Sequence, residues 1–345
     1  MEIAMSGKRH HFIPQFLLKG FKCKETDKGV FTFIIRKGTQ PIEANTKNIA
    51  VKSKFYEYNG KNSDDIITEN ESNYAKAIRE IITNKSIPIK FKNDTVSFIE
   101  SLVIRTKYFR DIINFSTHYL IDKASEDLLE DVTLTKIINK VIDKNDLLEK
   151  YIDDFCTKNK HVHRQEIERL FREKFKHERQ HIVDMLRSLA KEAVPNIFTL
   201  LKERVLPEIC TAQIDALSGT REATARFKRL SGFNWQIKIF EDNNLILGDI
   251  GPIAIEENGD VIHPIFSKNM LEIILPISPS IAIIGYHTAN EVPLNSSELN
   301  TMSASLSLDF IVSSRNSPDL PSYAKMIGAR SEKYYTAAID NLSKR

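Results

Sequence analysis

Residues 10–21 read HHFIPQFLLKGF, and the order of residue types in this stretch decides how the start of the fold is built. Pro14 restricts the residue before it to an extended conformation and is favourable at the first position of a helix. The apolar residues that follow predict a short helix, which Gly20 ends. Because His10 and His11 come directly before Pro14, we expect two imidazoles beside the start of this helix.

Strand patterns lie near both ends of the chain, and helical patterns lie between them. Segments rich in β-branched and aromatic residues predict the strands, and apolar residues recurring every three or four positions predict the helices. The predicted strands are Val30–Arg36, Lys54–Asn59, Trp235–Phe240, Leu245–Leu247, Ile253–Ile255, Ile273–Leu275, Ile281–Ile284 and Phe310–Val312. The predicted helices begin near Ser63 and at a cap on Asp94 or Thr95, and continue with Leu134–Ile142, Leu147–Phe155, Gln165–Leu189, Val194–Leu206 and Leu299–Leu306.

This order of elements predicts an α+β fold to which both ends of the chain contribute. We expect a small N-terminal sheet region, a central helical part with a charged helical insertion, and antiparallel or mixed C-terminal strands. The expected divisions are 1–122 with the histidine motif, strands and core helices, 123–163 as the insertion, 164–230 as long helices, and 231–345 as a strand-rich part packed back on the N-terminal region.

Composition excludes several classes of protein. The chain has 345 residues, a net charge of +3 and three widely spaced cysteines, so neither a disulfide framework nor a zinc ribbon is expected. The apolar runs are too short to span a bilayer and no signal peptide is recognisable. We therefore expect a cytoplasmic protein that does not bind a membrane and whose oligomeric state the sequence leaves open.

Two basic stretches make nucleic acid a candidate partner. Residues 8–37 carry eight Lys or Arg, and residues 158–191 carry ten. Such clusters can form a phosphate-facing surface. The ordinary alternative is that they are solvated faces of the protein.

The histidine pair has several interpretations. A neutral imidazole can act as a general base or bind a metal near pH 7, and a helix start favours anions. In ordinary packing, one ring would be buried and the other would face water. The stretch also resembles the histidine of ββα-metal nucleases, but that fold needs a downstream metal-binding histidine, and none occurs between His11 and His118.

Residues 177–181 read HERQH and match HExxH, the pattern of zinc proteases. His177 and His181 are one helical turn apart, and Glu178 could act as a base. The surrounding helix is heavily charged, and Arg179 between the two histidines opposes a dication, which favours a solvated helix.

Charged residues in apolar surroundings complete the candidates. Glu71 lies within a helical apolar pattern, and Arg105 lies within another. A buried guanidinium needs a partner, so a Glu71–Arg105 pair joining two helices is as good an explanation as catalysis. Asp249 lies in a strand-ending turn bounded by Gly248 and Gly251, where the alternatives are a functional carboxylate and an Asx-type turn.

Together these landmarks resemble the family catalogued as domain of unknown function 4238. The resemblance rests on the HHxxPxFxLxxF-like start, on Glu71 and Arg105-Thr106, and on three later segments: Asp249 to Pro252, Pro276–Pro279 and Leu299-Asn300. The family's Thr-Ser before the aspartate is replaced here by Leu-Gly. The resemblance implies a shared fold without a settled activity, and an accessory bacterial role such as phage defence or toxin activity.

Our leading hypothesis is a hydrolase acting on nucleic acid. His10, His11, Glu71, Arg105 and Asp249 are the candidate catalytic residues. Gln15, Ser278 and Asn300 are the candidate substrate-binding residues. A divalent metal is a possible cofactor, held by histidine or carboxylate ligands. The alternatives are a binding module for nucleic acid or protein that performs no chemistry, a structural defence component, and the zinc protease.

Overall fold

A computed structural model describes residues 9–53, 55–58, 61–62, 64–144, 146–218, 224–287 and 294–330. The chain divides into two compact units. Unit 1 comprises residues 1–116 and 207–345, and unit 2 comprises residues 117–206. Unit 2 thus begins and ends inside helices that continue into unit 1.

Most strands lie in two runs near the ends of the chain, with a run of helices between them, and the predicted α+β fold class is confirmed. The strands are β1 (Arg9–His11), β2 (Lys24–Thr26), β3 (Gly29–Arg36), β4 (Ile42–Asn45), β5 (Val51–Ser53), β6 (Glu57–Tyr58), β7 (Lys61–Asn62), β8 (Asn234–Ile239), β9 (Leu247–Gly248), β10 (Ile253–Glu256), β11 (Val261–Ile262), β12 (Met270–Ser278), β13 (Ile281–Tyr286) and β14 (Phe310–Ser313). The helices are α1 (Gln15–Gly20), η1 (Thr46–Asn48), α2 (Asp64–Asn84), η2 (Ile89–Phe91), α3 (Lys92–Arg105), α4 (Lys107–Leu129), α5 (Asp131–Asp143), α6 (Asp146–Lys158), α7 (Arg164–Ser218), α8 (Ala225–Ser231), α9 (Ser296–Leu306) and α10 (Leu320–Met326).

Two five-stranded antiparallel sheets form most of the β part of unit 1, and β1 with β5 and β6 with β7 form two further two-stranded sheets. One has the order β11-β10-β12-β13-β8 and is built entirely from the C-terminal half of the chain. The other has the order β2-β3-β14-β9, with β4 on β3, and joins the two ends of the chain. In that sheet Ile311 of β14 lies opposite Ile35 of β3. The C-terminal strands therefore complete a sheet that the N-terminal segment starts.

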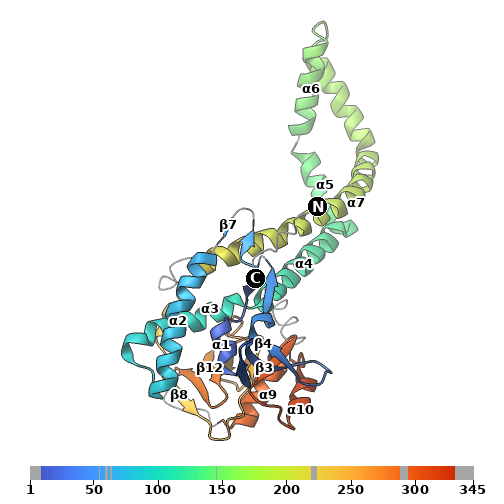
Figure 1. Ribbon diagram of the computed structural model, residues 1–345. Helices are drawn as coiled ribbons and strands as arrows, with labels where there is room; N and C mark the ends of the chain where they lie inside the picture. The colour runs from blue at the N-terminus through green and yellow to red at the C-terminus, as the bar shows by residue number, and fades with distance from the viewer. Residues whose placement is uncertain are drawn as a thin grey trace, which may run out of the picture. The chain divides into compact units, whose positions relative to one another are not determined.

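The short helix α1 lies between the sheets and joins them. It contacts β3 and β12, as Figure 1 shows, and Leu17 and Leu18 are completely buried in the core of unit 1. At Gly20 a Cβ atom would lie only 2.4 Å from the backbone oxygen of Ile277, so the close approach of α1 to β12 requires glycine. The predicted helix after Pro14, with its end at Gly20, is confirmed.

Helices α2 and α3 cover this core, and α3 is buried along most of its length. The predicted cap on Asp94 or Thr95 is wrong, because α3 begins at Lys92. The Thr95 hydroxyl instead donates to the Phe91 carbonyl, 2.8 Å away, inside the helix. The predicted strand Lys54–Asn59 is represented by β6 alone; Phe55 and Tyr56 lie in a turn, and Lys54 and Asn59 lie outside the described residues.

Unit 2 is helical. Helix α5 packs its apolar face, including Leu134 and Ile138, against Val183 of α7. On α6, Tyr151 contacts the ring of Phe171 of α7 edge-on. The sequence predicts two separate helices over Gln165–Leu189 and Val194–Leu206. They form one continuous helix, α7, which contains both Pro195 and Pro207. Strong helix formers on either side of these prolines favour continuation. No helix in the described ranges combines the length and apolar character needed to cross a membrane.

Candidate functional site

The two histidines of the motif lie on strand β1, and strand geometry separates their imidazoles. Strand β1 pairs antiparallel with β5, with His10 opposite Lys52 and His11 opposite Val51. Successive side chains of a strand point to opposite faces. The ring of His10 is accordingly buried, whereas His11 is half-buried. The two rings therefore have different surroundings, and only that of His11 is partly open to solvent.

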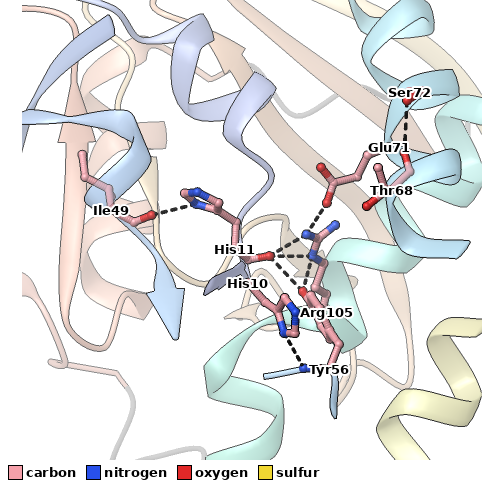
Figure 2. Close-up of polar contacts among 8 residues, drawn as sticks. All are labelled: His10, His11, Ile49, Tyr56, Thr68, Glu71, Ser72 and Arg105. Atoms are coloured by element: carbon pink, nitrogen blue, oxygen red, sulfur yellow. Dashed lines mark hydrogen bonds and ion pairs between the residues drawn. The ribbon is translucent and has the colours of Figure 1, made fainter. Parts of the chain in front are cut away.

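Arg105, the last residue of α3, is directed at the backbone of β1 and is 2% exposed. Its Nε donates to the carbonyl oxygen of His11 at 3.1 Å and to the hydroxyl of Tyr56, and its Nη2 donates to the same carbonyl. The Tyr56 hydroxyl donates to that carbonyl as well, at 2.9 Å. Figure 2 shows these groups converging on the His11 carbonyl. One main-chain oxygen is thus held from a helix and from a turn.

Glu71 of α2 supplies the countercharge. Its Oε1 accepts a hydrogen bond from Nη2 of Arg105, and its side chain remains 26% exposed. The predicted pair between Glu71 and Arg105 is present and joins α2 to α3. We call His11, Tyr56, Glu71 and Arg105 the arginine cluster.

The electrostatics of the cluster keep its protons in place at neutral pH. Burial raises the pKa of Tyr56 to about 12 despite the opposing charge of Arg105. Burial lowers the pKa of Arg105, but Tyr56 and Glu71 together raise it further than burial lowers it. The phenol therefore stays neutral and the guanidinium stays charged, as the hydrogen bonds require.

The imidazole of His11 points away from Arg105, toward Ile49, the residue after η1 (Figure 2). Its Nδ1 lies 3.0 Å from the carbonyl oxygen of Ile49. A carbonyl can only accept, so Nδ1 carries the proton and Nε2 of the neutral ring keeps its lone pair. Burial lowers the pKa of His11, opposed in part by the Ile49 hydrogen bond and the charge of Glu71. At neutral pH the ring is therefore a base with a fixed orientation.

His10 has a different set of contacts. Its Nδ1 accepts the backbone N–H of Tyr56 at 3.0 Å, and its ring stacks on the Tyr56 ring at a centroid distance of 5.3 Å. The same tyrosine thus contacts both histidines of the motif: its backbone N–H and ring contact His10, and its hydroxyl contacts the carbonyl of His11. In this arrangement His10 packs the turn at Tyr56 against β1.

Asp249 makes its hydrogen bonds to residues outside the arginine cluster. Its carboxylate accepts backbone N–H bonds from Leu308, Asp309 and Phe310, at 2.9, 2.7 and 3.4 Å. Burial raises its pKa to about 6, although these bonds favour the charged form. None of its hydrogen bonds within the described residues reaches His10, His11, Glu71 or Arg105. Asp249 therefore holds the segment before β14 against the turn that follows β9.

The three candidate substrate-binding residues lie in separate places. Gln15 begins α1 and is partly exposed. Ser278 ends β12, where its hydroxyl accepts the N–H of Ser280 at 3.4 Å. Asn300 of α9 is fully buried: its Oδ1 accepts from the N–H of Ile246 at 2.9 Å and its Nδ2 donates to Asn244 at 2.8 Å. Substrate binding by these residues stays a prediction, and for Asn300 both ends of the amide already hold backbone.

The HExxH segment lies in unit 2, on α7. His177 and His181 are exposed, and Arg179 pairs with Asp143 of α5 at 2.6 Å. Across the ranges that the structure describes, no group of three or more His, Cys, Asp or Glu side chains is placed to hold a metal ion. A divalent metal as cofactor stays a prediction.

Tyr56, a member of the cluster, and Ile49, whose carbonyl contacts the His11 ring, escaped the sequence reasoning. Tyr56 looks like an ordinary strand residue, and Ile49 contributes only a carbonyl. The one available signal was the aromatic pair Phe55-Tyr56 beside charged residues. No spacing rule links a turn at residue 56 to a motif at residue 10.

A family model described as "Protein of unknown function (DUF4238)" matches residues 9–327. The chain belongs to this family. The match spans the histidine motif, the arginine cluster, unit 2 and the C-terminal strands, so the DUF4238 family includes both units. No curated protein and no solved structure matches the chain.

Proposed function

We propose that this DUF4238 protein is a hydrolase that cleaves phosphodiester bonds of nucleic acid, with His11 as the general base. The observation that carries the proposal is the orientation of the His11 ring, fixed by the Ile49 carbonyl with the lone pair on Nε2. A base whose pKa lies below 6.5 is unprotonated at neutral pH and ready to take a proton from water. Catalysis by His10 is less well supported, because its ring is buried against Tyr56.

The other members of the arginine cluster have supporting roles in this proposal. The charge of Glu71 raises the pKa of His11, so it stabilises the imidazolium that forms when the ring takes a proton. Arg105 and Tyr56 hold the His11 carbonyl and thereby the position of the ring. Arg105 is then a positioning residue, because its buried guanidinium is directed at main chain and Glu71.

Basic residues beside His11 support a polyanionic substrate. Arg9 lies on the same strand, is exposed, and its charge contributes to lowering the pKa of His11. Its Nη1 donates to Asn48 at 3.1 Å, at the end of η1, and exposed Lys47 is in the same short helix. Cationic groups around a base attract phosphates and stabilise negative charge in the transition state. We also propose a role for this protein in phage defence or as a toxin, and cleavage of nucleic acid would serve either role.

The test uses the purified full-length chain with labelled single-stranded RNA, single-stranded DNA and duplex DNA. Each substrate is incubated with Mg²⁺, with Mn²⁺ or with EDTA, which also tests the predicted metal. We expect cleavage of at least one substrate and a loss of about 10²–10⁴-fold in His11→Ala. His181→Ala, an exposed histidine of unit 2, is the matched control and keeps full activity.

The same experiment separates the alternative, a binding module without chemistry. The exposed basic residues at β1 favour this second function if no substrate is cleaved. Salt-sensitive binding that persists in His11→Ala, with every substrate left intact, would replace the hydrolase with the binding module. Equal activity in His11→Ala and wild type would remove His11 from the mechanism.

A further inference from the structure

Unit 1 contains a cavity with polar and apolar walls. None of the residues that line it is part of the arginine cluster. Its volume is about 220 Å³, and it lies between α3, α8 and the segment that joins β11 to β12. At about 30 Å³ for each water molecule, this is room for roughly seven. The apolar lining includes Val103 of α3, Leu230 of α8 and Met270 of β12. A ligand of this size is a small molecule rather than a polymer.

Two arginines from α8 give the cavity its charge. Arg229 donates to the carbonyls of Ser267 and Lys268, at 3.1 and 2.9 Å, which fixes its guanidinium at the wall. Within the described residues no carboxylate is ion-paired with Arg229. Carbonyl partners satisfy its N–H groups without cancelling its charge. Arg226 lines the same cavity, and its side chain is 34% exposed.

A buried carboxylate, Glu100 of α3, lies close to Arg226. Its Oε1 accepts the hydroxyl of Thr224 at 2.6 Å and lies 3.9 Å from Nη1 of Arg226, the outer limit of an ion pair. Its Oε2 is buried and has no hydrogen-bond partner among the described residues. A buried charge left under-satisfied in this way is costly, and the nearby charge of Arg226 offsets part of that cost. The Arg226 guanidinium thus lines the cavity with the Glu100 carboxylate at the outer limit of an ion pair.

The positive charge also affects the surrounding interior. His263 is fully buried, and burial together with the charge of Arg226 lowers its pKa to about 3. It is therefore neutral at physiological pH and adds no positive charge. Among the lining residues that the structure describes, the cations are Arg226 and Arg229.

We infer that this cavity binds a small organic anion, with a phosphate or carboxylate group at Arg226 and Arg229 and a compact apolar body against Val103, Leu230 and Met270. Guanidinium groups suit both anions because their N–H groups match the spacing of the oxygens. The apolar wall excludes water from the rest of the ligand and favours an organic anion over a free inorganic one. This site is independent of the proposed hydrolase and of His11.

The test measures binding to the full chain by titration calorimetry. The probes are phenyl phosphate, benzoate, inorganic phosphate and the neutral benzyl alcohol. We expect phenyl phosphate or benzoate to bind more tightly than both inorganic phosphate and benzyl alcohol, and the stronger of the two identifies the anionic group. We expect Arg226→Gln to weaken that binding by about tenfold or more, because the variant loses a charge-assisted hydrogen bond to the anion. Lys228→Gln, an exposed cation on α8 that does not line the cavity, changes it by less than about twofold.

Glu100→Gln provides a test with the opposite sign. It keeps an oxygen for the Thr224 hydroxyl but removes the negative charge that competes for Arg226, so the anion binds several-fold more tightly. This gain cannot come from unfolding and therefore decides the matter if Arg226→Gln does not fold. The inference is overturned if neither organic anion binds more tightly than benzyl alcohol. It is also overturned if Arg226→Gln and Lys228→Gln weaken binding equally, or if Glu100→Gln leaves it unchanged.

Discussion

Two pairs of histidines in the chain have spacings that occur in catalytic or metal-binding sites: His10 with His11, and His177 with His181. The surroundings of the two pairs differ in the structure. His10 and His11 lie on a paired strand, where a buried arginine and a tyrosine hold the backbone of His11. His177 and His181 lie on one face of a long helix, and both are exposed. The second pair has the better-known spacing, and the first has the more elaborate surroundings. Partners and burial therefore distinguish the two pairs more clearly than their spacing does.

The largest expected difference between the two regions comes from their arginines. Arg105→Ala leaves the His11 carbonyl and Glu71 without their shared donor and opens a void, which should lower the free energy of unfolding by about 3 kcal/mol. Arg179→Ala removes a partly exposed pair with Asp143 and should cost less than about 1 kcal/mol. Urea denaturation followed by Trp235 fluorescence and far-UV circular dichroism measures both. Equal losses would erase the distinction between the regions.

The histidines themselves give the next effect. His10→Ala removes the acceptor for the Tyr56 N–H and the ring stacked on Tyr56, at a cost of about 2 kcal/mol. His177→Ala changes an exposed side chain and should stay within about 0.5 kcal/mol of wild type. The same denaturation experiment applies. A neutral result for His10→Ala would mean that the turn at Tyr56 is held by its other contacts alone.

The tyrosine hydroxyl is a finer probe. Tyr56→Phe keeps the buried ring but removes the group that donates to the His11 carbonyl and accepts from Arg105, so we expect a loss of about 1 kcal/mol. Tyr151→Phe, on an exposed ring of α6, is the matched control and should be nearly neutral. If the proposed base depends on its backbone support, Tyr56→Phe also lowers the cleavage rate, whereas Tyr151→Phe does not.

The smallest effect concerns a pKa and leaves the fold unchanged. The ring of His11 should titrate below 6.5 in NMR spectra, because burial disfavours its charged form. Cleavage should accordingly rise with pH through that pKa and level off above it. Glu71→Gln removes a charge that raises the pKa, so it should move the midpoint lower still, while Glu69→Gln on the same helix leaves it in place. A midpoint at or above 6.5 in wild type would contradict the fixed, half-buried ring.

Local sequence patterns predicted much of the fold. Pro14 and Gly20 give the bounds of α1, and β-branched runs mark β3, β12 and β13. These signals succeed because proline, glycine and β-branched residues restrict the backbone within a few residues of themselves. They fail in α7, where strong helix formers on both sides of a proline continue the helix through it. They also fail at the start of α3, where the position of the cap depends on the preceding turn.

What the sequence determined by itself was the residue types and the short-range geometry: a histidine pair before a proline-started helix, and lone charges in apolar runs that needed partners. The pairing of Glu71 with Arg105 was accessible in this way, because burying a guanidinium without a carboxylate is costly. The tertiary structure decided that Arg105 holds the His11 backbone, that Tyr56 joins it, and that Asp249 holds a different segment. Those contacts join residues tens of positions apart through main-chain groups. Every residue carries main-chain polar groups, so the amino-acid sequence does not indicate which of them will accept or donate these hydrogen bonds.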